Sequence, residues 1–190
     1  GWNDQLFINL SKTSKFKLVE LESLFSGGKN SLIQIYLDEI NNKMKIESKK
    51  LNLLRLRTHE RIREIMILRL KIMLKEKNIV SKTFSHLLLP QNYKFATKNL
   101  YKTVDEIWFL AGDNSTDFNF YSKRIILGSI YSLTMLHFVN NQDINETIKF
   151  LDKQLKNTSY IPKLKNKTYD IIKIIPKALK FKKKFSFIKQ

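Results

Sequence analysis

The chain has 190 residues, of which 43% are hydrophobic and 12% aromatic, so it is long and apolar enough to fold around a core. It has no cysteine, which excludes a disulfide framework, a thiolate metal site and a cysteine nucleophile. Its 35 Lys and Arg residues against 17 Asp and Glu residues give a formal charge of +18, which favours an anionic partner, although AT-rich codons produce the same excess of lysine.

The spacing of apolar residues predicts helices along most of the chain, and no segment has the signal of a strand pair or a hairpin. Gly27 and Gly28 indicate a turn near the N-terminus, Pro90 ends one helix and Gly112 ends another. In chain order, the expected helices cover residues 2–10, 16–25, 30–44, 58–77, 80–89, 93–111, 118–139 and 143–157. This pattern predicts an all-α fold.

Apolar residues lie on more than one face of the two longest expected helices. In the helix expected over residues 58–77, Met66, Arg69 and Met73 lie along adjacent faces, so one cation stands among apolar side chains. Residues 118–139 are apolar all round, which is typical of a helix that is buried on several sides. Such a helix belongs to a core, to a dimer interface or to the wall of an apolar cavity.

The stretch before residue 118 is rich in polar and aromatic side chains. Asp113 and Asp117 flank a helix start, where carboxylates cap free N–H groups, so we interpret them as caps and not as an acid–base pair. The aromatic residues Phe118, Phe120 and Tyr121 cannot all face one core, because successive helical positions lie about 100° apart. At least one of these three aromatic side chains is therefore expected to be exposed.

No set of residues in the sequence predicts catalysis. His59, His86 and His137 are far apart and do not form an HExxH pairing, and the turn SGGKNS lacks the spacing of a phosphate-binding loop. The sequence therefore predicts a protein that is not an enzyme and that has no metal and no cofactor.

Residues 1–40, GWNDQLFINLSKTSKFKLVELESLFSGGKNSLIQIYLDEI, resemble the DNA-binding end of the TetR-type regulators. The shared features are a Gly-aromatic opening, a glycine-containing turn and a long following helix. Glu20 and Glu22 lie where those regulators grip phosphates, and the DNA backbone would repel them. The resemblance implies a TetR-like helical bundle with a degenerate helix-turn-helix and no specific binding of nucleic acid. A TetR-type DNA-binding transcriptional regulator stays the alternative function.

Four further motifs lie within residues 58–157: THERIREIMILRLKIM, LLLPQN, DEIWFLAGDNSTDFNFYSKRIILGSIYSLTMLHFV and FLDKQLKN. Together they closely resemble the Coq-nine family of accessory proteins in ubiquinone biosynthesis. The resemblance implies a homodimer with an internal lipid site for an isoprenoid quinone precursor or a phospholipid. It also implies a partner, the diiron hydroxylase that acts on demethoxyubiquinone. The expected function is to bind lipid and to present a quinone precursor to this hydroxylase.

The resemblance also implies where these contacts lie. The hydroxylase contact is expected at Asp117, Asn119, Phe120, Tyr121 and Arg124. The family usually has Trp where this chain has Phe120, so an aromatic side chain is kept there. The expected lining of the lipid site is Leu100, Trp108, Ile126, Ile130, Met135 and Phe138.

The C-terminal segment has the pattern of a helix that lies in a membrane surface. Its apolar arc is formed by Ile171, Ile174, Ile175, Phe181 and Phe185. Its basic face is formed by Lys173, Lys177, Lys180 and Lys184. Pro176 interrupts the helix, and a solvated tail is the alternative interpretation. We expect this segment to bind an anionic membrane.

The sequence thus predicts three regions: a degenerate helix-turn-helix in residues 1–50, a lipid-binding helical domain in residues 51–159 and a membrane-binding tail in residues 160–190. The expected location is peripheral on an inner membrane. This would be the cytoplasmic face in a bacterium or the matrix face in a mitochondrion.

Overall fold

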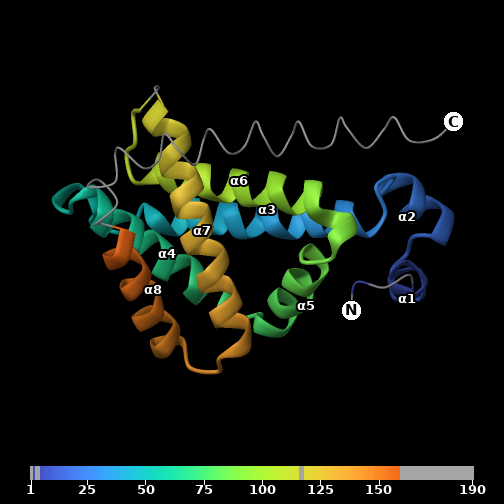
Figure 1. Ribbon diagram of the computed structural model, residues 1–190. Helices are drawn as coiled ribbons and strands as arrows, with labels where there is room; N and C mark the ends of the chain where they lie inside the picture. Colours follow the sequence, from blue (N-terminus) through green and yellow to red (C-terminus); the bar gives the residue numbers. More distant parts are fainter. Residues whose placement is uncertain (1, 3–4, 116–117, 159–190) are drawn as a thin grey trace, which may run out of the picture. The chain divides into compact units, whose positions relative to one another are not determined.

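The computed structural model describes Trp2, residues 5–115 and residues 118–158 (Figure 1). In this part of the chain the secondary structure is entirely helical, so the predicted all-α class is confirmed. The α-helices are α1 (Gln5–Thr13), α2 (Leu18–Leu24), α3 (Lys29–Ser48), α4 (Thr58–Leu74), α5 (Lys77–Leu87), α6 (Tyr93–Leu110), α7 (Phe118–Asn140) and α8 (Ile144–Thr158). Two short 3-10 helices cover Leu53–Arg55 and Pro90–Asn92.

The chain divides into two compact units, Gly1–Asp152 and Lys153–Gln190. Only residues 153–158 of the second unit are described, so the following account concerns the first unit. The boundary expected at residue 50 falls between α3 and α4, which pack against each other. The division into three functional regions stays a prediction.

The core forms where α3, α4 and α6 pack together, and α7 packs against both α6 and α5 (Figure 1). Its fully buried apolar side chains come from every one of these elements except α5: Ile33, Met44, Ile65, Met66, Leu70, Val104, Ile107 and Phe138. Burying a side chain of this size stabilises the fold by about 1.5–3 kcal/mol. Shared burial therefore holds the helices in one bundle.

The N-terminal helices α1 and α2 pack against each other, and Trp2 ties this end of the chain to the bundle. The indole Nε1–H of Trp2 donates to the hydroxyl of Thr83 on α5 at 3.0 Å. The Trp2 ring also lies 6.4 Å from the ring of Tyr36 on α3. Trp2, the aromatic residue of the Gly-aromatic opening, thus has a packing role in this fold.

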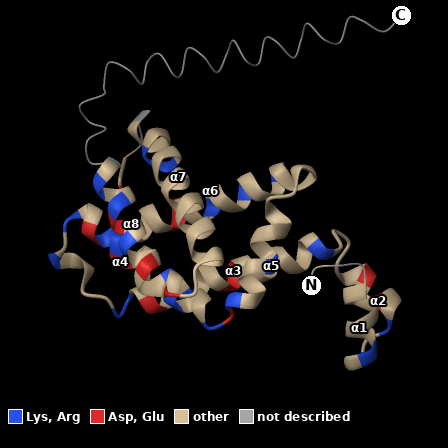
Figure 2. Cartoon of the chain, turned by 60° about the horizontal axis from the view of Figure 1, so that its bottom comes forward, with Lys and Arg blue, Asp and Glu red and all other residues tan. Residues whose placement is uncertain are grey.

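Basic residues are spread over most of the helices, and acidic residues are interleaved with them around α3 and α4 (Figure 2). Arg63 on α4 forms a bidentate pair with Asp152 on α8, with Nε–Oδ1 at 2.6 Å and Nη2–Oδ2 at 2.9 Å. Lys102 on α6 pairs with Asp38 on α3 at 2.7 Å. Contacts of this kind join helices that are distant in the sequence.

Gly112 ends α6 as predicted, and its backbone conformation explains why. Its φ of +82° is one that side chains with a Cβ rarely adopt. The N–H of Gly112 donates to the carbonyl of Phe109, and the N–H of Asp113 donates to that of Trp108, both at 3.0 Å. These two bonds form a Schellman motif, which turns the chain sharply toward α7.

Replacing Gly112 with Ala should lower the free energy of unfolding by about 1–2 kcal/mol, because of the positive φ. The added Cβ would also lie 3.1 Å from Nη1 of Arg61. Gly128→Ala is the matched control: it lies within α7, where the new methyl meets Leu100 at an ordinary 3.9 Å and helix propensity favours Ala. Urea unfolding of both variants checks this, and equal stability of the two would contradict it.

Candidate functional site

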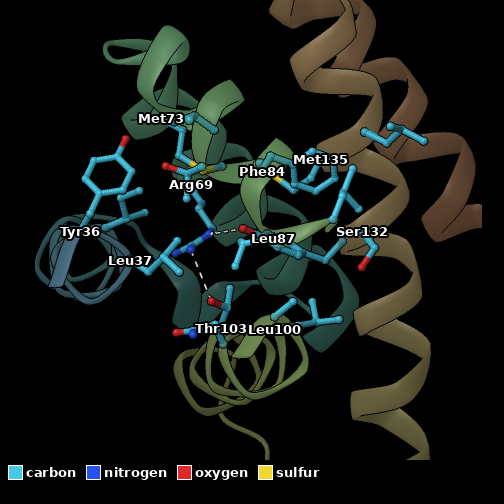
Figure 3. A pocket seen from close by; sticks show the side chains of 18 of the residues that line it. Tyr36, Leu37, Arg69, Met73, Phe84, Leu87, Leu100, Thr103, Ser132 and Met135 are labelled. Carbon is cyan, nitrogen blue, oxygen red and sulfur yellow. Dashed lines mark hydrogen bonds between the residues drawn. The ribbon is translucent and has the colours of Figure 1, made fainter. Parts of the chain in front are cut away.

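An apolar cavity of about 410 Å³ lies among α3, α4, α5, α6 and α7 (Figure 3). Its apolar lining includes Leu37, Met73, Phe84, Leu87, Leu100 and Met135. Small side chains at Ala96 and Ser132 leave part of this space unfilled. Leu88, Leu133 and Leu136 also line it and are substantially exposed, so the cavity reaches the surface. A space of this size and character suits an apolar ligand.

One charged side chain, Arg69 of α4, lines this apolar space and is 1% exposed. Its Nε–H donates to the hydroxyl of Tyr131 at 2.9 Å, and an Nη1–H donates to Oδ1 of Asn41 at 2.7 Å. Nη2 of Arg69 lies 3.4 Å from the hydroxyl oxygen of Thr103, the contact drawn toward the labelled Thr103 in Figure 3. Three helices besides α4 therefore supply the surroundings of Arg69.

A second cluster joins the end of α6 to the start of α7. The carboxylate of Asp113 accepts hydrogen bonds from Nζ of Lys123 at 2.7 Å, from the hydroxyl of Ser115 at 2.8 Å and from Nη1 of Arg124 at 3.3 Å. Nε of Arg124 also donates to Oδ1 of Asp105 on α6 at 2.6 Å. The described partners of the Asp113 carboxylate are side chains, so this carboxylate ties the end of α6 to the second turn of α7. Residues 116 and 117, where the cap was expected, are not described, so capping by Asp113 and Asp117 stays a prediction.

Aromatic side chains lie over this cluster. The ring of Phe120 covers the guanidinium of Arg124, with Cζ 3.3 Å from the ring centroid. Tyr121 meets Phe120 edge-on, with the ring centroids 5.2 Å apart, and is 61% exposed. Farther along α7, Ile125 is 69% exposed. This part of α7 thus presents apolar groups to the surface above the ion pairs of Arg124 and Asp113, which are both buried.

Comparison with known proteins gives the family. A family model described as COQ9 matches residues 93–161. The chain is 34% identical to the ubiquinone biosynthesis protein COQ9, mitochondrial, of Rattus norvegicus over 103 residues. These 103 residues cover 53% of this chain and 33% of the rat protein. The chain is also 30% identical to the ubiquinone biosynthesis protein COQ9-A, mitochondrial, of Xenopus laevis over 141 residues. These residues cover 70% of this chain and 44% of the Xenopus protein.

The chain belongs to the COQ9 family. A relative from Dictyostelium discoideum, named a probable ubiquinone biosynthesis protein coq9, is 30% identical over 79 residues, 40% of this chain and 26% of that protein. The chain therefore matches about a third of the first of these COQ9 relatives and less than half of the second.

The structure separates the six residues that were expected from the sequence to line a lipid site. Leu100 and Met135 line the cavity. Ile130 and Phe138 are buried at 4% and 1% exposure but lie outside the lining. Trp108 donates its indole N–H to the carbonyl of Lys123 at 3.2 Å and so belongs to the α6–α7 junction. The sixth, Ile126, is half-buried and also lies outside the lining.

The residues that were expected from the sequence to contact a partner also differ in position. Asn119 and Tyr121 are exposed, and Phe120 is half-buried. Arg124 is 7% exposed and lies beneath Phe120, where its ion pairs support the surface. Asp117 lies outside the described residues.

The residues expected to bind a membrane, between Ile171 and Phe185, all lie outside the described part of the chain. Within the part that is described, no helix is long and apolar enough to cross a membrane.

Sequence reasoning missed the polar lining of the cavity. Thr103 and Tyr131 lie on helices that were predicted from the sequence, but no motif marks them as neighbours of Arg69. The one available signal was Arg69 itself, a cation on faces otherwise formed by Met66, Met73 and similar side chains.

Proposed function

We propose that this chain is a lipid-binding accessory protein of ubiquinone biosynthesis that presents a quinone precursor to the demethoxyubiquinone hydroxylase. The observation that carries this proposal is the double role of α7. Its residues Tyr131 and Met135 line the apolar cavity, and its first turns carry the exposed Tyr121. One helix therefore connects a place for a lipid with a surface for a partner protein.

The names of the relatives support the biological setting of the proposal. The proteins from Rattus norvegicus and Xenopus laevis are named mitochondrial ubiquinone biosynthesis proteins. We place this chain on the matrix face of the mitochondrial inner membrane, as a peripheral homodimer without catalytic activity of its own. The basic C-terminal pattern supports attachment to an anionic membrane.

A DNA-binding regulator is the less favoured function. Glu20 and Glu22 are both exposed on α2, the helix expected to correspond to the recognition helix. Carboxylates on that surface would be repelled by DNA phosphates, which supply most of the affinity of such proteins.

Native mass spectrometry of the purified chain tests the lipid-binding part of the proposal. We expect a co-purifying amphiphile that solvent extraction identifies as an isoprenoid or a phospholipid. Ser132→Phe should reduce its occupancy to less than half, because Ser132 lines the cavity. Ser129→Phe is the matched control on the exposed side of α7 and should retain the lipid. Equal lipid content in the two variants would refute the cavity as the binding place.

A further inference from the structure

Arg69 is a buried cation whose hydrogen-bond acceptors are all neutral. They are the hydroxyl of Tyr131, the amide oxygen of Asn41 and the hydroxyl of Thr103, with the thioether of Met44 at 3.8 Å. None of the carboxylates that the structure describes forms a salt bridge with it. A buried charge without a counter-charge is costly, because protein groups replace its hydration only in part.

Arg124 shows the contrasting arrangement in the same bundle. It is 7% exposed, a burial comparable to that of Arg69, but it pairs with both Asp105 and Asp113. The difference lies in their surroundings: Arg69 borders the cavity, and the cavity lining contains no Asp and no Glu. The negative charge that would balance Arg69 is therefore missing on the side where a ligand enters.

Tyr131 gives the cavity a direct donor beside this cation. Its hydroxyl oxygen accepts the Nε–H of Arg69, so its own hydrogen points to another acceptor. No side chain or carbonyl in the described part of the chain accepts that hydrogen, and Tyr131 lines the cavity. A hydroxyl that is backed by a guanidinium favours an acceptor that carries negative charge.

We propose that the cavity favours an amphiphile with an oxyanion head group, a carboxylate or a phosphate, over a neutral amphiphile. The head group accepts the hydrogen bond of Tyr131, and Arg69, which is 1% exposed, stabilises the charge from behind it. The chain of the ligand lies along apolar lining residues such as Leu100 and Met135. A neutral head group gains less from the cation, and an ammonium head group is repelled. This inference rests on the proposed lipid binding and goes beyond the quinone precursor, whose neutral head group gains less from Arg69.

Titration calorimetry with the full chain, freed of lipid, tests this selectivity at neutral pH. Three ligands of one chain length are compared: a fatty acid, an alkyl phosphate and a fatty alcohol. We expect the dissociation constant of at least one of the two anions to be lower than that of the alcohol by a factor of about ten or more. Whichever anion binds more tightly identifies the head group.

Two variants and a control assign the selectivity to named side chains. Tyr131→Phe and Arg69→Met should bring the affinities for anion and alcohol together while the alcohol still binds. Tyr101→Phe, which removes a hydroxyl from an exposed position of α6, should keep the selectivity of the unmodified chain. If Arg69→Met does not fold, the unmodified chain and Tyr131→Phe decide the question.

The outcomes separate this inference from the function on which it rests. Equal affinity of the unmodified chain for all three ligands overturns the oxyanion selectivity and leaves lipid binding standing. Selectivity that persists in Tyr131→Phe and in Arg69→Met, where the latter folds, overturns the assignment to these residues. Failure of all three ligands to bind overturns this inference, whereas the proposed function is decided separately by the lipid found in native mass spectrometry.

Discussion

Tyr121→Ala should weaken binding of the demethoxyubiquinone hydroxylase at least about tenfold and change the thermal stability of the chain little. Interface energy is concentrated in a few aromatic and Arg anchors, and truncating such an anchor costs about 2 kcal/mol or more. Tyr121 is 61% exposed and its described ring contact is with Phe120, so its removal disturbs little of the fold.

Phe120→Ala should affect both hydroxylase binding and the stability of the fold, because the Phe120 ring has two roles. It belongs to the expected contact surface, and it also covers the guanidinium of Arg124 at 3.3 Å. We therefore expect weaker hydroxylase binding together with a loss of stability of about 1–2 kcal/mol.

Calorimetry with the purified hydroxylase and thermal unfolding of each variant measure the two effects separately. Tyr101→Ala is the matched control, since Tyr101 is an exposed tyrosine on α6 outside the expected contact surface. Undiminished hydroxylase binding in both Tyr121→Ala and Phe120→Ala would show that the start of α7 is not the contact surface.

Asp113→Asn should lower the free energy of unfolding by about 2–4 kcal/mol at neutral pH. The side chains of Asp113 and Arg124 are only 4% and 6% exposed, so the loss of the carboxylate removes a buried charge partner. The substitution also weakens the hydrogen bond from Lys123. Glu146→Gln is the matched control: that side chain is 50% exposed in its pair with Lys149, so its loss should change stability by less than about 1 kcal/mol.

The stabilisation from Asp113 should also depend on pH. Burial by itself would raise the pKa of Asp113, but hydrogen bonds from Lys123, Ser115 and Arg124 outweigh it and hold the pKa below its ordinary value. A lowered pKa in the folded state means that the stabilisation is present above the unfolded-state pKa of about 4 and is lost as the pH falls through the folded-state pKa.

Urea unfolding from neutral to acidic pH measures this dependence. The stability difference between the unmodified chain and Asp113→Asn should begin to shrink below about pH 4, where the carboxylate of the unfolded chain becomes protonated. It should disappear once the pH has fallen through the lower folded-state pKa. A difference that stays constant over this range would mean that the charge of Asp113 does not stabilise the junction.

The helices and their ends were predictable because their causes are local. Apolar spacing depends on a few neighbouring residues, and so do the breaks at Pro90 and Gly112. The helix expected over residues 118–139 is observed as Phe118–Asn140, and that over residues 143–157 as Ile144–Thr158. The motifs from IW to STDFN likewise predicted the COQ9 family, since a family pattern is a property of the sequence itself.

The face that each side chain presents depended on the tertiary structure. Residues 118–139 are apolar all round, so the pattern does not distinguish Met135, which lines the cavity, from Phe138, which packs in the core. Arg124 looked like a surface contact, but it is buried beneath Phe120 and pairs with Asp105 and Asp113. The acceptors of Arg69 come from α3, α6 and α7. Only the packing of these helices brings such side chains together, because hydrophobic periodicity records burial but not which neighbour causes it.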